Sequence, residues 1–337
     1  MTNLTTADKP LSQSGMGREV VFGDGGGRTF ASLAVAQPDW FTHSLDEARG
    51  LLLVRGLSEI SVEPPLLVDL SRLFGLEVED YRRTLTAKHQ VHPEIPEIFV
   101  VSNAPPASRI PPPQPDPPRL ADGGLPVQFP HRRGWHTDQS YRRPPPDVSL
   151  FYCVEPAPID QAQTLYADGI GAYQGLPPEL KARVDGLVGI HAQPGIGRGE
   201  NAVRAGEAPK QLEPHQLPQR QALVRSHPVT GEKALYLCEA GQMDWIDGPF
   251  DGMEPGLDGD GAKLLYELMS HYTQPQFVYV HEWQQGDLII YDNRCTIHAA
   301  TWFEAEQHDR VMWRTTICGN PGTEYAGEVP SWIPAVG

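Results

Sequence analysis

The chain has 337 residues, enough for two average domains or for one large β or α/β domain with inserted loops, and either arrangement can bury a sizeable core. Its 27 basic and 43 acidic residues give a net charge of −16, which argues against a nucleic acid partner because the surface as a whole repels polyanions. The polar start, MTNLTTADKPLSQSG, lacks the apolar core of a signal peptide, and no apolar run has the length of a membrane helix. We therefore expect a soluble, cytoplasmic protein without membrane contact, with a disordered segment over residues 1–18 and a single domain over residues 19–337.

The expected elements follow in chain order. Residues 45–57 predict a short helix ending at Gly50 and then a buried strand, whereas the glycine-rich residues 23–28 lack the Lys-Ser/Thr of a phosphate loop and predict a turn. Residues 66–75 have leucines at helical spacing, and residues 97–103 predict a strand. Beyond them, helices are expected at 177–187 and 261–272 and strands at 146–155, 163–169, 276–283, 286–293, 296–303 and 310–319. Residues 227–237 predict a hairpin turn at Thr230-Gly231 followed by a strand.

Two long segments break this pattern. In residues 104–118, eight of fifteen residues are proline, a composition that excludes a helix or a central strand and predicts an extended surface loop. Residues 192–222 are polar and aperiodic, and predict a second long loop. We expect inserted loops at about 104–133 and 192–222, flanking the mouth of a pocket; the alternative for the first is a plain proline-rich connector.

The stretch GWHTDQSY (residues 134–141) carries the first chemical signal. On a strand, residues two apart point to the same face, so His136 and Asp138 can converge on one point. An isolated HxD pair more often marks a hydrogen-bonded pair than a metal site. A third ligand candidate, His298, follows the predicted strand GDLIIYDN, although a single histidine there could also be an ordinary core residue.

The last predicted strand, RVMWRTTICG, places Arg310 and Arg314 on one face. Two arginines on the same face of an apolar strand are costly to bury unless each meets an anion. Two histidines and one carboxylate leave open positions on one side of a metal, as in non-haem Fe(II) oxygenases, and a zinc hydrolase could use the same three ligands. The arginine pair favours the oxygenase, because a dicarboxylate cosubstrate that chelates iron at one end needs a cation at the other.

The order WHTD, QTLYADG, DNRCTIHAA and RVMWR resembles the TauD/TfdA family of Fe(II)- and 2-oxoglutarate-dependent dioxygenases, and the similarity extends over about residues 48–319. The resemblance implies a mostly β double-stranded β-helix (a cupin-like jelly roll) with flanking helices. It also implies that His136, Asp138 and His298 bind Fe(II). The cosubstrate 2-oxoglutarate is then held by Thr164 and Arg310.

The resemblance implies further roles. Arg314 matches the arginine that grips the acidic group of the substrate in several family members, and His92 matches a histidine that contacts the substrate. The reaction implied is oxidation of an unactivated C–H bond, usually hydroxylation, with O2 as cosubstrate and with release of succinate and CO2. Because related halogenases replace the carboxylate ligand with a small residue, Asp138 argues against halogenation. A small, anionic substrate is expected, and a homodimer remains open.

Alternatives remain within and beyond this family. Members also perform desaturation and oxidative rearrangement in biosynthetic pathways. A zinc-dependent hydrolase or a catalytically silent binding protein could use the same fold. The inserted segments put any direct transfer of taurine or herbicide specificity in doubt.

Overall fold

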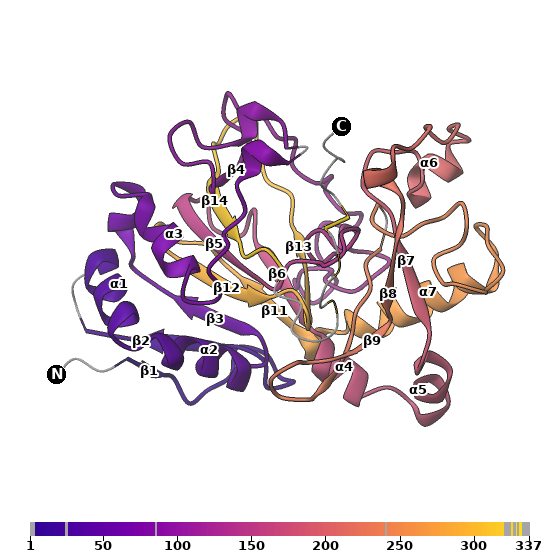
Figure 1. The fold of residues 1–337 in the computed structure, drawn as a ribbon, viewed down its shortest axis with the longest axis horizontal. Helices are drawn as coiled ribbons and strands as arrows, with labels where there is room; N and C mark the ends of the chain where they lie inside the picture. Colours follow the sequence, from indigo (N-terminus) through magenta and orange to yellow (C-terminus); the bar gives the residue numbers. More distant parts are fainter. Residues whose placement is uncertain are drawn as a thin grey trace.

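The structure is a computed structural model that describes residues 4–23, 26–84, 86–239 and 241–319, with residues 325, 328, 330 and 331. Two sheets form its centre (Figure 1). The larger sheet has seven strands, in the order β1 (Thr5–Thr6), β2 (Arg18–Val21), β3 (Leu51–Val54), β12 (Leu288–Asp292), β5 (Val148–Glu155), β14 (Val311–Thr316) and β4 (Phe99–Ser102). The smaller sheet has three strands, in the order β11 (Val278–His281), β6 (Thr164–Asp168) and β13 (Thr296–Ala300).

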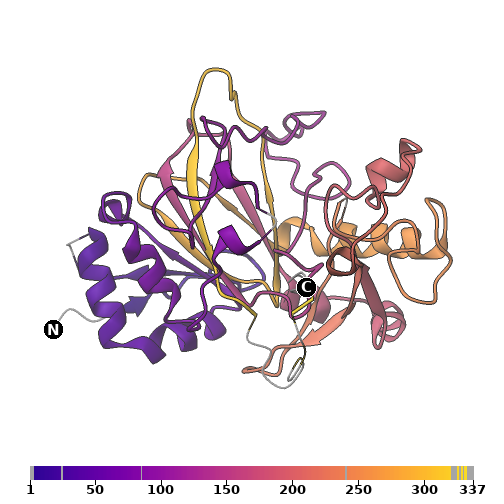
Figure 2. The ribbon, with the colours of Figure 1, turned by 45° about the horizontal axis from the view of Figure 1, so that its top comes forward.

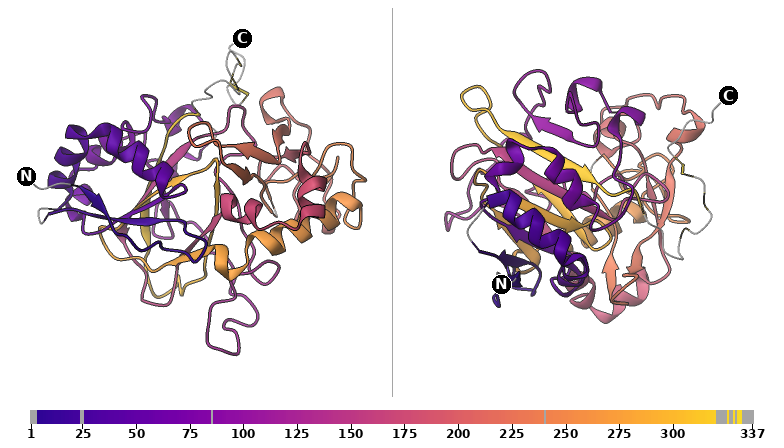
Figure 3. Two further views of the ribbon diagram at one scale, coloured as in Figure 1. Left: turned by 90° about the horizontal axis from the view of Figure 1, so that it is seen from below. Right: turned by 60° about the vertical axis from the view of Figure 1, so that its left-hand side comes forward.

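Helices cover the outer faces of both sheets. The helices are α1 (Gly26–Ala36), α2 (Pro38–Glu47), α3 (Pro65–Ser71), α4 (Gly169–Gln174), α5 (Pro178–Val184), α6 (Glu200–Arg204) and α7 (Asp260–Tyr272). Figures 2 and 3 show the same order from other sides: α1 to α3 lie at one end of the molecule, α7 at the other, and the sheets between them. Two short antiparallel ribbons complete the fold, β7 (Val188–His191) with β8 (Gln219–Ala222) and β9 (Val224–Ser226) with β10 (Lys233–Leu235).

The alternation of side chains along the strands separates the core into layers. On β14, Met312 packs between the two sheets, whereas Trp313 packs on the other face, with the core that α1 to α3 cover. On β6, Tyr166 joins the layer between the sheets, and Leu165 faces the core around α7. Because successive strand residues point to opposite faces, Arg310 and Arg314 share the inward face of Met312, as the sequence predicted.

The architecture is a mixed arrangement of helices and sheets in which most expected elements are present. In the described part of the chain, no helix is long and apolar enough to cross a membrane. Residues 104–133 contain no helix or strand, in agreement with the predicted loop.

Three expectations were wrong. Residues 4–18 are ordered, because Leu4 and Met16 are buried and β1 pairs with β2; residues 1–3 lie outside the described residues. Residues 192–222 are not a plain loop, since they contain α6 and β8, and β8 pairs with β7. The predicted turn at residues 23–28 is the start of α1, whose Phe30 packs edge-on against Phe41 of α2; residues 24 and 25 lie outside the described residues.

Candidate metal and cosubstrate site

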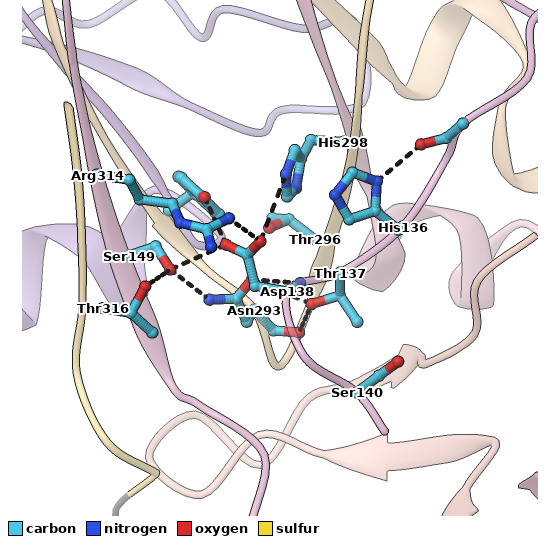
Figure 4. A network of polar contacts seen from close by, with 12 residues as sticks. His136, Thr137, Asp138, Ser140, Ser149, Asn293, Thr296, His298, Arg314 and Thr316 are labelled. Atoms are coloured by element: carbon cyan, nitrogen blue, oxygen red, sulfur yellow. Dashed lines mark hydrogen bonds and ion pairs between the residues drawn. The ribbon is translucent and has the colours of Figure 1, made fainter. Parts of the chain in front are cut away.

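His136, Asp138 and His298 meet at the end of the layer between the two sheets. The backbone of His136 pairs with that of His298, with N–H to O distances of 2.9 and 2.7 Å, so the HxD segment adds to the edge of the smaller sheet beside β13. Each of the three side chains offers a ligand atom, and these atoms lie within 4.8 Å of one another. Figure 4 shows the three side chains converging on one point.

Hydrogen bonds fix the orientation of His136 and Asp138, whereas Nδ1 of His298 has no hydrogen-bond partner among the described residues. Nδ1 of His136 lies 2.7 Å from the carbonyl oxygen of Gly134, which leaves Nε2 for the metal. Gly134 has a φ of +93°, a left-handed conformation that glycine adopts without strain. Oδ2 of Asp138 accepts hydrogen bonds from Tyr291 (2.6 Å) and Ser149 (3.1 Å), and Oδ1 lies 3.9 Å from Nε2 of His298.

The charge states suit metal binding at neutral pH. Burial lowers the pKa of His298 to about 3 and also lowers that of His136, so both imidazoles are neutral. Burial alone would raise the pKa of the Asp138 carboxyl, but the Arg314 guanidinium, helped by the hydrogen bond from Tyr291, holds that pKa well below its usual range. The site therefore presents two neutral imidazoles and one carboxylate, a donor set that fits a divalent metal.

Arg310 and Thr164 lie side by side in a cavity of about 330 Å³ that His136 and His298 also line. Nη2 of Arg310 is 3.5 Å from Oγ1 of Thr164, which accepts a 2.9 Å hydrogen bond from Trp283. Arg310 is only 6% exposed and meets no carboxylate among the described residues, and burial lowers its pKa to about 10. A buried, unpaired guanidinium that lines a cavity calls for an anionic ligand.

Arg314 lines a second cavity of about 380 Å³, together with His136 and Asp138 of the cluster. Its Nη1 forms an ion pair with Oδ1 of Asp138 (Figure 4). Its guanidinium lies 5.0 Å from the ring centre of Phe99. Arg314 lines both cavities, as does His136, whereas Thr164 and Arg310 line only the first. The second cavity is thus on the other side of the cluster from Arg310.

Both inserted segments reach these cavities. Ile110, Pro111 and Pro112 of the proline-rich segment (residues 104–118) line the first, and Gln193 and His215 line the second. Residues of both segments therefore belong to the walls of the two cavities.

His92 lies outside the described linings of the two cavities. Its Nδ1 accepts hydrogen bonds from the backbone N–H groups of Glu94 (3.3 Å) and Ile95 (3.2 Å), and its ring packs edge-on against Trp313. Trp313 faces the α1–α3 side of the sheet, and the described lining of the two cavities does not include His92. We therefore leave His92 out of the candidate site.

A second group of potential ligands, His227, Asp292 and Cys295, is buried nearby. Arg294 binds both carboxylate oxygens of Asp292, with Nε 2.9 Å from Oδ1 and Nη2 2.6 Å from Oδ2. Nε2 of His227 lies 3.0 Å from the same Oδ2. The carboxylate is already engaged by the Arg294 guanidinium and the His227 ring, so this group is a polar network around an ion pair rather than a metal site.

Sequence reasoning missed Tyr291, Ser149 and Asn293. Asn293 accepts hydrogen bonds from the backbone N–H of Asp138 (3.1 Å) and from the Thr137 hydroxyl (3.1 Å at Oδ1, 2.8 Å at the carbonyl). A signal existed for Tyr291, because alternation along GDLIIYDN puts it on the same face as Ile289. Nothing in the sequence indicated that this face meets Asp138.

The half-buried cluster beside the buried Arg310 has the donor set for a metal and a cation for an organic acid, and the comparisons agree with that class. The sequence model of the taurine catabolism dioxygenase TauD, TfdA family matches residues 7–316. The chain therefore belongs to this family, which includes α-ketoglutarate-dependent dioxygenases.

Among curated relatives, the chain is 33% identical over 197 residues to a (S)-phenoxypropionate/alpha-ketoglutarate-dioxygenase of Sphingobium herbicidovorans, covering 57% of this chain and 64% of the relative. It is 29% identical to an alpha-ketoglutarate-dependent 2,4-dichlorophenoxyacetate dioxygenase of a Burkholderia species, over 54% of this chain and 57% of that protein. Both matches span less than two thirds of the relative's length. The crystal structure of AAD-2 in complex with Mn(II) and N-oxalylglycine is similar over 94% of this chain and 98% of its own, with 25% identity and a TM-score of 0.70.

Proposed function

We propose that this chain is an Fe(II)- and 2-oxoglutarate-dependent oxygenase that oxidises a C–H bond of a small anionic substrate. The observation that carries the proposal is Arg310, a buried guanidinium without an anionic partner in the described chain, lining the same cavity as His136 and His298. A metal site alone would not need this arginine, whereas a dicarboxylate that chelates the metal would. For the same reason a zinc-dependent hydrolase does not account for the site.

His136, Asp138 and His298 hold the metal in this proposal. Tyr291 and Ser149 hold Oδ2 of Asp138, and Oδ1, which pairs with Arg314, lies 3.9 Å from Nε2 of His298 and would be the oxygen offered to the metal. When bound, Fe(II) supplies the redox chemistry by which 2-oxoglutarate, O2 and R–H become succinate, CO2 and R–OH. The two sheets that carry these residues are the two halves of the proposed double-stranded β-helix.

Arg310 and Thr164 bind the distal carboxylate of 2-oxoglutarate. The pKa of Arg310 remains high enough for a full positive charge at neutral pH, and Trp283 orients the Thr164 hydroxyl. Because Trp283 donates to Oγ1, the hydroxyl proton of Thr164 remains available to donate to the carboxylate. Burial around Arg310 excludes water and strengthens this charge pair.

Arg314 faces the substrate. It lines the second cavity, on the side of the cluster away from Arg310, and we assign it to the acidic group of the substrate. The relatives named for phenoxyalkanoate oxidation and the relative from Pseudomonas putida named a sulfate ester dioxygenase support an organic anion as substrate. Desaturation and rearrangement use the same residues, and the substrate decides between these outcomes.

The test is succinate release from 2-oxoglutarate under air, with Fe(II), in the presence of a panel of small organic acids. Stimulation by at least one acid, with loss of activity in Asp138→Ala and His298→Ala, is the expected result. Conversion of an acid that proceeds equally well without O2 or 2-oxoglutarate would overturn the proposal.

A further inference from the structure

Arg109 is held beside the site by the backbone of the proline-rich segment. Its N–H donates a 2.8 Å hydrogen bond to the carbonyl oxygen of Ser102, the last residue of β4, and the N–H of Ser108 donates to Ala104 at 3.1 Å. Ala107 is buried, and three consecutive prolines begin two residues after Arg109. The segment is therefore anchored on the sheet and stiff where it carries this arginine.

Arg109 lines both cavities, and the described residues common to the two linings are Arg109, His136 and Arg314. Its guanidinium has no hydrogen-bond or ion-pair partner among the residues that the structure describes. Arg314, by contrast, is already paired with Asp138. Arg109 is thus the uncompensated cation where the two cavities meet.

The electrostatics of the neighbourhood agree with this position. The Arg109 side chain is exposed to solvent through the two cavities that it lines. Partial burial by the surrounding protein lowers the pKa of Arg109, and the positive charge of Arg314 lowers it further, whereas the carboxylate of Asp138 raises it. Arg109 and the proposed metal ligand His136 line the same two cavities, so this positive charge lies beside the cluster.

We infer that Arg109 and Arg314 together bind the anionic group of the substrate, so that the proline-rich segment contributes a specificity-determining cation. This inference rests on the proposed function and assigns Arg109 to an organic acid bearing a carboxylate, sulfonate or sulfate. A substrate anion that met only Arg314 would share that guanidinium with Asp138, whereas Arg109 offers an unshared one. The distal carboxylate of 2-oxoglutarate has its own cation in Arg310, at a position that lines only the first cavity.

The experiment uses the full chain loaded with Mn(II) and N-oxalylglycine, an inert analogue of 2-oxoglutarate. Three probes, phenoxyacetate, taurine and hexyl sulfate, are titrated into it by calorimetry. The variants are Arg109→Gln, Arg109→Lys and the matched control Arg119→Gln, which removes an exposed arginine paired with Asp160 just beyond the segment. Since Arg109 is anchored through its backbone, Arg109→Gln should fold, and its thermal unfolding is measured alongside.

The expected result is that at least one probe binds the wild-type protein and binds Arg109→Gln about tenfold or more weakly, the cost of one charge-assisted contact. N-oxalylglycine affinity should change less than about threefold, Arg109→Lys should be intermediate, and Arg119→Gln should match the wild type. Unchanged probe affinity in Arg109→Gln, or a loss confined to N-oxalylglycine, would overturn the inference. The inference would also be overturned if the wild-type protein bound N-oxalylglycine but none of the three probes. If the wild-type protein did not bind N-oxalylglycine, the proposed function would be overturned instead.

Discussion

Replacement of Arg310 by glutamine separates cosubstrate binding from the rest of the site. The substitution removes the only positive charge assigned to the distal carboxylate of 2-oxoglutarate and leaves Thr164 and the metal ligands in place. Arg310 also packs 5.7 Å from the ring centre of Phe151, and glutamine keeps part of that contact. Arg310→Lys keeps the charge but loses the planar fork that binds a carboxylate through two hydrogen bonds.

The magnitude follows from burial. Arg310 is 6% exposed, so water cannot replace it at the carboxylate. Breaking a buried, hydrogen-bonded charge pair by removing one partner costs about 3–5 kcal/mol. At about 1.4 kcal/mol per factor of ten, Arg310→Gln should weaken 2-oxoglutarate binding by roughly 10²- to 4 × 10³-fold, and Arg310→Lys by about tenfold because the charge remains.

The assay is the KM for 2-oxoglutarate from succinate release, together with calorimetric titration of N-oxalylglycine into the Mn(II)-loaded protein. Mn(II) affinity should stay within about threefold of the wild type, since Arg310 contacts none of the three proposed ligands in the described structure. A change of less than about threefold in both cosubstrate measurements would refute the reasoning, as would a loss of metal that accounts for the whole effect.

Two further predictions concern the support of the site and the stability of the fold. Tyr291→Phe removes the 2.6 Å hydrogen bond to Oδ2 of Asp138 and should lower Mn(II) affinity by about 10- to 100-fold, measured by metal titration; wild-type affinity would show that Asp138 is oriented without it. Asp292→Asn leaves buried Arg294 without its carboxylate and should cost about 3–5 kcal/mol of unfolding free energy at pH 7. Burial alone would raise the pKa of Asp292, but Arg294 and the hydrogen bond from His227 hold that pKa well below its usual range. The stabilisation from the Asp292–Arg294 pair is therefore fully present above the unfolded-state pKa of about 3.9, and it declines as the pH falls below that value. In denaturant titrations, the difference in unfolding free energy between the wild type and Asp292→Asn should therefore become smaller below about pH 4. A difference that does not change with pH would contradict the assignment of this stabilisation to the ionised Asp292 carboxylate.

Local patterns predicted the strands that carry the site. Period-two alternation on β14 puts Met312 in the layer between the sheets and Trp313 on the opposite face, and therefore places Arg310 and Arg314 inward. His136 and Asp138 converge, but not as neighbours on one strand face as the HxD spacing predicted, since His136 lies in an isolated β-bridge and Asp138 in a turn. Both sequence patterns depend only on residues close in sequence. Their interpretation as a family motif depended on the resemblance of the sequence to the TauD/TfdA family.

Contacts between distant segments could not be predicted. The ion pair of Arg314 with Asp138 depends on the register of β14 against β5, which pairs Arg314 with Phe151. The order of residues 4–18 depends on parallel pairing of β2 with β3, which no local pattern indicates. Arg109 was hidden for a similar reason: the composition of its segment predicted an extended loop, but not the surface that the loop would meet.

Calorimetric titration of N-oxalylglycine tests the central claim, that one site binds a metal and a 2-oxoglutarate-like acid together. The titration compares the metal-free chain, the Mn(II)-loaded chain and the His298→Ala variant with Mn(II) present. The proposed site predicts tight binding only to the Mn(II)-loaded wild-type chain. Binding of equal strength without the metal, or undiminished binding to His298→Ala, would contradict it.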